Sequence, residues 1–424
     1  MINRSILIIF SLFILLASYS ETNADIIALK AVGVVNPVMS EFISSSIDDA
    51  VQEKAELIVI LLDTPGGLDT SMRSIVKKII SSVVPVVVYV YPSGGRAASA
   101  GVFITLSAHI AAMSPGTNIG AAHPVGVGGK AEKTMAEKAE NDAAAYIRSL
   151  AEKRGRNAEW AEEAVRKSVS ITETEALDLG IIDLVAPDIK TLLDSVEGMV
   201  VETSLGEYTV RSKGIKIRYI EMNMRSKILD ILSDPNIAYM LMLLGFYGIF
   251  FELTNPGAIF PGVIGAISLI IAFYSFQTLP VNYAGLLLII TAIILFILEI
   301  KVTSFGLLTI GGIISMLIGS LMLFDSPLPF LKLSLKVIMP AVILTTIFFS
   351  LTVWLALKAY RRRPATGPEG LVGLEGEART DINKKGMVFV HGELWRAWSE
   401  EEIKAKQEIV VEEVKGLQLK VRAK

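Results

Sequence analysis

Two short segments of small residues carry the groups that cleavage of an acyl bond requires. Ser99 lies in the run 94–101 (GGRAASAG), where the neighbouring side chains are too small to block access to its hydroxyl. The turn 63–67 (DTPGG) ends in Gly66 and Gly67, whose consecutive N–H groups can point into a cleft. A serine nucleophile needs donors of this kind to stabilise an oxyanion. The two segments therefore predict a nucleophile at Ser99 and an oxyanion hole at Gly66 and Gly67.

The segments that must position these groups alternate between strand and helix, which predicts a parallel sheet with right-handed crossovers. Ser99 is expected to open a helix over 99–106 directly after the third strand. Because ligand sites of such sheets form at the carboxyl ends of the strands, Ser99 and Gly67 can meet at this edge. The expected elements are strands at 26–34, 57–62 and 83–91, and helices at 40–54 and 70–82.

A serine nucleophile also needs a base, and the candidates are His109, His123 and a lysine. His109 follows the 99–106 helix and is expected to point away from Ser99. A lysine base must bring its pKa from ~10.4 to about 7, which takes roughly 4–5 kcal/mol and is available from desolvation against an apolar wall. The useful lysine must therefore face inward.

Lys138 lies on the edge of the inward face predicted for a helix over 131–154, whereas Lys133 lies opposite, toward solvent. The spacing alone leaves open an ordinary surface ion pair between Lys138 and Asp142, four residues further on. The residues expected on the inward face are Met135, Ala139, Asp142, Tyr146 and Leu150.

Composition indicates an exported domain joined to a membrane region. Hydrophobic residues make up 52% of the 424 residues, and the net charge of −3 gives no reason to expect a nucleic-acid partner. The chain has no cysteine and only 3 scattered histidines, which excludes thiol chemistry and makes a metal site unexpected; no cofactor is expected. Residues 1–24 are predicted to be a signal peptide, which places the domain 25–230 outside the cytoplasmic membrane. The end of that domain, residues 190–230, is expected to be a tail.

Five apolar segments predict a transmembrane region of four to five helices within 237–360, although the first segment is short for a span. Lys358 and the run 361–363 (RRR) after the last segment predict a cytoplasmic C-terminal part. Short strands broken by glycines predict a small closed β-barrel over 366–424. Trp395 and Trp398 are candidates for a binding face of this barrel, and core packing is the alternative for Trp395. The apolar segments lie at 237–253, 257–276, 283–299, 303–324 and 337–357.

Several motifs, in the same order, resemble the NfeD family of membrane-bound serine proteases, whose catalytic domain shares the ClpP/crotonase fold. The resemblance covers essentially the whole chain after the signal peptide. It implies an α/β ClpP-like protease domain, a helical transmembrane bundle and an OB-like C-terminal barrel that binds protein. The motifs are DTPGG at 63–67, ASAG at 98–101, SPGTNIGAAHP at 114–124, KAENDA at 138–143, GRNAEWAE at 155–162, NPGAIFPG at 255–262 and GELW at 392–395.

The resemblance also implies roles for particular residues. Ser99 would be the nucleophile and Lys138 the base, and the amide of Ala100 would help the two glycines to form the oxyanion hole. The family implies cleavage of hydrophobic segments, with a stomatin-like membrane protein as substrate and partner. Domains of this fold class usually associate, so a homodimer or higher oligomer is expected. His123 is the competing base, because its spacing from Ser99 resembles that between serine and histidine in soluble ClpP; Asp183 would then be a third member.

Two functions of other classes stay open. The membrane bundle and the barrel are also compatible with a scaffold that partners a stomatin-like protein with little proteolysis. The same fold and double-glycine oxyanion hole serve crotonase-like acyl-thioester chemistry, which an exported location, away from coenzyme A, disfavours.

Overall fold

The computed structural model of the chain describes residues 25–125, 133–254, 257–302, 304, 306–326, 329–360 and 368–424. The predicted signal peptide lies outside these residues. The chain divides into two compact units, one formed by the residues up to 291 together with 315–341, and the other by 292–314 together with 342–424.

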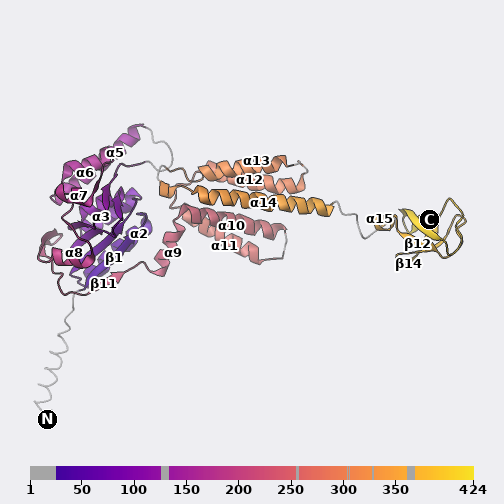
Figure 1. Ribbon diagram of the computed structural model, residues 1–424, viewed down its shortest axis with the longest axis horizontal. Helices are drawn as coiled ribbons and strands as arrows, with labels where there is room; N and C mark the ends of the chain where they lie inside the picture. The colour runs from indigo at the N-terminus through magenta and orange to yellow at the C-terminus, as the bar shows by residue number, and fades with distance from the viewer. Residues whose placement is uncertain are drawn as a thin grey trace, which may run out of the picture. The chain divides into compact units, whose positions relative to one another are not determined.

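A six-stranded parallel sheet with the order β11-β1-β2-β3-β5-β8 is the centre of the N-terminal domain (Figure 1). The strands β2 and β3 are almost wholly buried, as expected for a parallel sheet that is covered on both faces. The structure therefore confirms the three predicted strands, of which the first and third are shorter than predicted and the second ends one residue later. The strands are β1 (Ile26–Val32), β2 (Leu57–Asp63), β3 (Val86–Val90), β5 (Ile110–Met113), β8 (Leu184–Val185) and β11 (Ile217–Ile220).

Helices and a second, three-stranded sheet surround this core. The helices α2 (Pro37–Gln52), α3 (Asp69–Ile80) and α4 (Ala100–Ser107) bury their apolar residues against one face of the large sheet. The small sheet has the order β4-β6-β7 and lies next to the start of α4. The remaining elements here are β4 (Arg96–Ala98), β6 (Asn118–Gly120), β7 (Ser170–Thr172), α5 (Lys133–Lys153), α6 (Ala158–Arg166) and α7 (Glu173–Asp178).

The expectation of a tail at 190–230 is wrong, because this segment completes the domain. Buried apolar residues of the segment cover the second face of the large sheet, and β11 pairs in parallel with β1, with Ile217 opposite Ile26. The segment ends in a helix that leads toward the membrane region. Besides β11, its elements are α8 (Ile189–Val196), β9 (Val200–Thr203), β10 (Gly206–Thr209) and α9 (Met224–Leu232).

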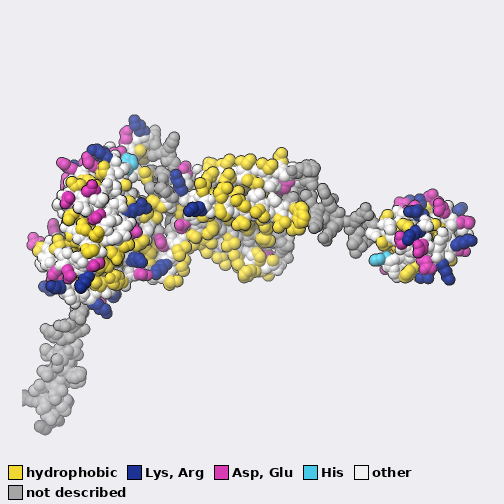
Figure 2. All heavy atoms as spheres, viewed as in Figure 1, with side chains coloured by type: hydrophobic (Ala, Val, Ile, Leu, Met, Phe, Trp, Pro, Cys, Tyr) yellow, Lys and Arg dark blue, Asp and Glu magenta, His cyan; other side chains and the backbone are white. Residues whose placement is uncertain are grey.

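Five apolar helices follow, at the positions of the five predicted segments. Among the described residues, Pro235–Thr254 and Leu335–Thr352 are long and apolar enough to cross a membrane, and the other three helices have shorter apolar stretches. Hydrophobic side chains cover the visible outside of these helices (Figure 2). The helices are α10 (Pro235–Thr254), α11 (Phe260–Phe276), α12 (Tyr283–Lys301), α13 (Leu307–Met322) and α14 (Leu335–Tyr360), with the short turn η1 (Pro329–Leu331) before α14.

The C-terminal residues form the closed barrel that the sequence predicts, with the order β12-β13-β14-β16-β15. Trp395 packs against the apolar core of the barrel, whereas Trp398 carries the ammonium groups of Lys415 and Lys420 over its ring. The elements are α15 (Pro368–Leu371), β12 (Glu375–Ala378), β13 (Gly386–Val390), β14 (Glu393–Trp398), β15 (Glu408–Lys415) and β16 (Gln418–Ala423).

Candidate active site

Ser99 is held in a strained backbone conformation between β4 and α4. Its φ of 53° and ψ of −111° lie outside the regions that residues with a Cβ prefer, at a cost of about 1–3 kcal/mol. Two hydrogen bonds hold this geometry: the Ser99 N–H donates to the Gly120 carbonyl (3.0 Å), and the Ser99 carbonyl accepts from the Val102 N–H (3.0 Å). The expected helix therefore begins one residue later, at Ala100, and β4 comes between β3 and this helix in the sequence.

The glycine turn is fixed to the segment that follows β1. The Val35 N–H donates to the Gly66 carbonyl (2.9 Å), and the Leu68 N–H donates to the Val35 carbonyl (2.8 Å). A Cβ added to Gly67 would lie 2.1 Å from the Val35 carbonyl oxygen, and one added to Gly66 would lie 2.7 Å from the Ser99 Cβ. Only glycine fits at these two positions, because both backbone segments approach too closely for a side chain.

The three predicted oxyanion donors are not equivalent. The Gly66 N–H donates to the Thr64 hydroxyl (3.0 Å), so it is already engaged within the turn. In the described part of the chain, the N–H groups of Gly67 and Ala100 have no acceptor. Ala100 is the first residue of α4, where backbone N–H groups lack partners inside the helix. The two free donors are therefore Gly67 and Ala100, and Gly66 shapes the turn.

A cavity of ≈ 130 Å³ brings these groups together. Among the described residues its wall is mostly apolar, and Asp69, which contributes a carboxylate to it, pairs with Arg73 (2.9 Å). No sequence pattern predicts that Leu68 and Phe103 line a site, although Met72 lies on the apolar face of the helix predicted at 70–82. The cavity is lined by Gly67, Leu68, Asp69, Met72, Ser99, Ala100, Phe103, Ala122, Pro124, Val125 and Ala143.

Lys138 lies on the exposed amino-terminal part of α5, outside the lining of this cavity. The predicted inward face is wrong for this part of the helix, since Met135 is 58% exposed and Ala139 and Asp142 are exposed too. Among the described residues, no side chain of α5 before Ala143 is buried, and Glu140, Asn141 and Asp142 make only polar contacts with arginines of neighbouring helices. The buried residues of α5 are Ala143, Ala144, Ile147, Leu150 and Ala151.

Arg73 of α3 binds α5 at Asp142, one turn after Lys138. The Arg73 guanidinium pairs with Asp142 and lies over the ring of Tyr146, 4.4 Å from the ring centroid. Asp142 is thus engaged by Arg73, and among the described residues no ion pair joins it to Lys138. The alternative interpretation of Lys138, as the partner of Asp142, is therefore not what the structure shows.

Neither histidine candidate is among the residues that line the cavity beside Ser99. His109 is buried, and its Nδ1 accepts a hydrogen bond from the Val86 N–H (3.1 Å), at the amino end of β3 and therefore opposite the edge where Ser99 lies. Burial and the nearby guanidinium groups lower the pKa of His109 to about 3. The ring of His123 contacts the Val165 carbonyl of α6 (3.0 Å) through Nδ1, whereas its two neighbours in sequence line the cavity.

The contacts of Asp183 join elements of the fold and lie outside the cavity that holds Ser99. Its carboxylate pairs with the buried Arg156 (2.6 Å) and accepts a hydrogen bond from the Ala111 N–H (2.6 Å). Arg156 also donates to the carbonyls of Leu106 (2.7 Å) and Ala108 (3.0 Å), so the pair joins α4 to the end of the large sheet. The structure does not bring Asp183 into contact with His123. Within the described residues, no group of three or more acidic or histidine side chains is placed to hold a metal ion.

Three family models match successive parts of the chain. Residues 26–203 match the N-terminal domain of NfeD1b, residues 236–355 match the NfeD integral membrane domain, and residues 368–422 match the NfeD-like C-terminal, partner-binding domain.

Curated proteins and solved structures agree with these matches. The chain is 37% identical to the membrane-bound protease PH1510 of Pyrococcus horikoshii over 408 residues, which cover 93% of this chain and 92% of that protein. It is 31% identical to the membrane protein NfeD1b of Bacillus subtilis over 282 residues, 66% of this chain and 63% of that protein. A solved structure of the 1510-N membrane-bound stomatin-specific protease, a lysine-to-alanine mutant in complex with a substrate peptide, is 36% identical with a TM-score of 0.46 and covers 49% of this chain and 97% of that one.

Proposed function

The chain belongs to the NfeD family of membrane proteases, and from this premise we propose that it is a serine endopeptidase in which Ser99 is the nucleophile and Lys138 the base. The observation that carries the proposal is the environment of Ser99. A strained serine, with two free backbone N–H groups beside it, stands on the wall of an apolar cavity. This combination is what acyl transfer to a serine requires.

The reaction follows from these groups. The Ser99 Oγ attacks the carbonyl carbon of the scissile bond while the neutral Lys138 amine takes the hydroxyl proton. The N–H groups of Gly67 and Ala100 stabilise the negative charge on the tetrahedral oxygen. The lysine then returns the proton to the leaving amine, which breaks the peptide bond and leaves an acyl-enzyme. Water, deprotonated by the same lysine, releases the second product.

Because Lys138 is exposed, the proposed mechanism requires the substrate itself to exclude water from the lysine. Lys138 lies about 7.5 Å along the helix axis before Ala143, which lines the cavity. In the proposed mechanism, a substrate seated in the cavity covers this part of α5 and excludes water from it. Removal of an amine from water favours its neutral form, which is the form that a base needs.

The cavity and the domain composition support the remaining parts of the proposal. Apolar side chains such as Leu68, Met72 and Phe103 favour a hydrophobic segment as substrate. The related enzyme of known structure is named stomatin-specific, and we propose a stomatin-like membrane protein as substrate and as partner of the C-terminal barrel. Five spans would put the protease domain outside the cytoplasm and the barrel inside it. Association into a dimer or higher oligomer stays a prediction.

The test is peptide cleavage by the full-length protein in detergent, with products identified by mass spectrometry. Ser99→Ala and Lys138→Ala are expected to lower kcat by a factor of about 10²–10⁴, the usual contribution of such groups. Lys133→Ala is the matched control, because Lys133 is an exposed lysine on the same helix. This variant and His123→Ala are expected to keep the wild-type rate.

Two results would contradict the assignment. A loss of cleavage in His123→Ala with full activity in Lys138→Ala would make the histidine the base. Cleavage by Ser99→Ala at the wild-type rate would remove the nucleophile, and a wild-type protein that cleaves none of the peptides would favour the scaffold function.

A further inference from the structure

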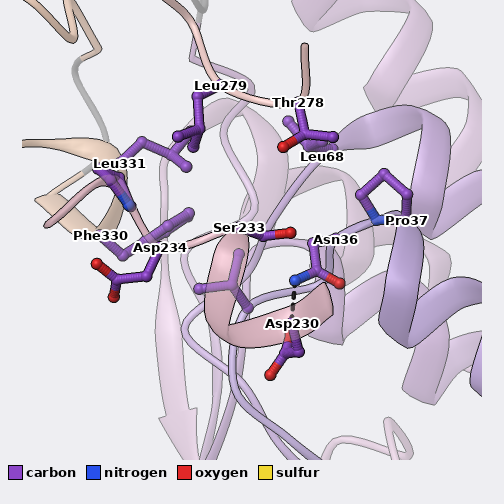
Figure 3. Close-up of a pocket in the computed structure, with 12 residues that line it drawn as sticks. Asn36, Pro37, Leu68, Asp230, Ser233, Asp234, Thr278, Leu279, Phe330 and Leu331 are labelled. Atoms are coloured by element: carbon purple, nitrogen blue, oxygen red, sulfur yellow. Dashed lines mark hydrogen bonds between the residues drawn. The ribbon is translucent and has the colours of Figure 1, made fainter. Parts of the chain in front are cut away.

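A second cavity lies beside the catalytic one, in the same compact unit, and is called the junction cavity here (Figure 3). Its volume is ≈ 140 Å³. One wall comes from the loop between β1 and α2. The other walls come from the end of α9, the start of α10, the connection between α11 and α12, and the turn η1. The junction cavity is therefore formed where the protease domain meets the ends of apolar helices.

The junction cavity and the catalytic cavity share one residue, Leu68. Leu68 follows Gly67 directly, and its N–H is bound by the Val35 carbonyl (2.8 Å). Asn36, which follows Val35 in the sequence, lies on the wall of the junction cavity. The two cavities are thus separated by the oxyanion turn itself, so a polypeptide bound at Ser99 can reach both.

The chemistry of the junction cavity combines an apolar wall with uncompensated negative charge. Pro37, Leu279 and Phe330 contribute apolar surface, and Asp230 and Asp234 contribute carboxylates. A cavity of about 150 Å³ is large enough for a benzene ring, so this one accepts a leucine or phenylalanine side chain.

Each of the two carboxylates has one oxygen that is already used. Asp230 accepts from the Asn36 side-chain amide (2.7 Å), and Asp234 accepts from the Asn236 N–H (2.7 Å) at the start of α10. Within the described residues, neither carboxylate forms an ion pair, and the second oxygen of each has no donor. The site therefore has room for a cationic group next to an apolar one.

We propose that the junction cavity is a second substrate subsite: it takes an apolar side chain of the polypeptide being cleaved, while a neighbouring lysine or arginine of that polypeptide pairs with Asp230. The inference rests on the proposed endopeptidase function and names part of its substrate class. A lysine or arginine at the end of an apolar segment keeps its charged group in water while its stem lies along apolar surface, so one segment can present an apolar residue and a cationic group side by side. The junction cavity is formed at the ends of apolar helices, next to the protease domain.

Disulfide trapping in the full-length protein tests the proposal, because the natural chain has no cysteine and a single introduced one reacts uniquely. In an inactive Ser99→Ala background, Thr278→Cys places a thiol in the junction cavity and Val125→Cys places one in the catalytic cavity. Asp194→Cys, on the exposed side of α8, is the control. The probe is a peptide with an apolar run followed by lysine, carrying one methanethiosulfonate group.

The expected result is a reaction at residues 278 and 125 at least tenfold faster than at 194, with competition by the unmodified peptide. A fast reaction at 125, with residue 278 no faster than 194, would overturn the subsite and leave the endopeptidase proposal intact. Slow reaction at 125 as well would count against the proposed function itself.

A kinetic experiment on the active protein tests the charge. Asp230→Asn keeps an oxygen that can accept from Asn36, and removes the negative charge. For a peptide with lysine after the apolar run, KM is expected to rise about fivefold with kcat unchanged. For the same peptide with glutamine in place of lysine, KM is expected to stay the same. An equal rise for both peptides would show that Asp230 acts on the structure alone, and would overturn the pairing.

Discussion

His109 is expected to make the stability of the protease domain depend on pH. The side chain is only 7% exposed and accepts a hydrogen bond from the Val86 N–H, so it is held in its neutral form. Burial is the main reason why the pKa of His109 falls to about 3, and the positive charges of Arg154 and Arg156 add to the effect. In the unfolded chain the same group takes up a proton near pH 6.5.

The sign and size of the effect follow from this difference. As the pH falls below about 6.5, the unfolded chain gains a proton at His109 that the folded domain does not accept until about pH 3. The contribution of neutral His109 to the free energy of unfolding is therefore fully present above pH 6.5 and is lost as the pH falls from there to about 3. The loss is about 1.4 kcal/mol for each pH unit, which amounts to about 2 kcal/mol of unfolding free energy between pH 7 and pH 5.

Urea unfolding of residues 25–223 at the two pH values measures this quantity. Trp160 is the single tryptophan of that segment and is buried, so its fluorescence reports unfolding. The matched variant is His109→Asn, because the asparagine carbonyl oxygen can accept from the Val86 N–H but does not titrate. The wild type should lose about 2 kcal/mol more than the variant between pH 7 and pH 5. Equal losses in the two proteins would refute the reasoning.

Two further predictions concern the glycine turn and the buried ion pair. In Gly67→Ala, the new Cβ would lie 2.1 Å from the Val35 carbonyl oxygen, so the turn must move. The kcat for peptide cleavage should then fall by a factor of about 10²–10³, while an unchanged circular dichroism spectrum would show that the variant is folded. A wild-type kcat would contradict the oxyanion role of Gly67. Arg156→Ala leaves the Asp183 carboxylate unpaired, which should lower the free energy of unfolding by about 3 kcal/mol; an unchanged urea midpoint would show that the pair contributes no net stability.

The parts of the fold that the sequence predicts are those with strong local patterns. The runs 57–62 and 86–90 are continuously apolar, and this pattern is typical of strands that are buried on both faces. The strand β11 was missed because it lies at the edge of the sheet, is only 4 residues long and pairs with β1, nearly the whole domain away in sequence. No local signal distinguishes such a strand from a tail.

The errors within the site have the same origin. Helical spacing shows which residues of α5 share a face, but not where the neighbouring surface ends, and that surface ends at Ala143. Consecutive glycines indicate available N–H groups, but the Gly66 N–H donates to the Thr64 hydroxyl and is therefore not available to an oxyanion. The alternation that points Ala122 and Pro124 into the cavity, and His123 away from it, depends on an extended backbone that the sequence alone does not fix.

The structure fixes two of the proposed catalytic groups in the core and leaves the third exposed. Ser99 is held by Gly120, and Gly67 by Val35, so the proposed nucleophile and oxyanion donor are in place without substrate. Among the described residues, none buries the part of α5 that carries Lys138. A neutral lysine base requires a dry environment, and in the proposed mechanism the substrate completes this environment. On this proposal the nucleophile stays unactivated until a hydrophobic segment fills the cavity, so the requirement for an apolar substrate arises from the chemistry as well as from binding.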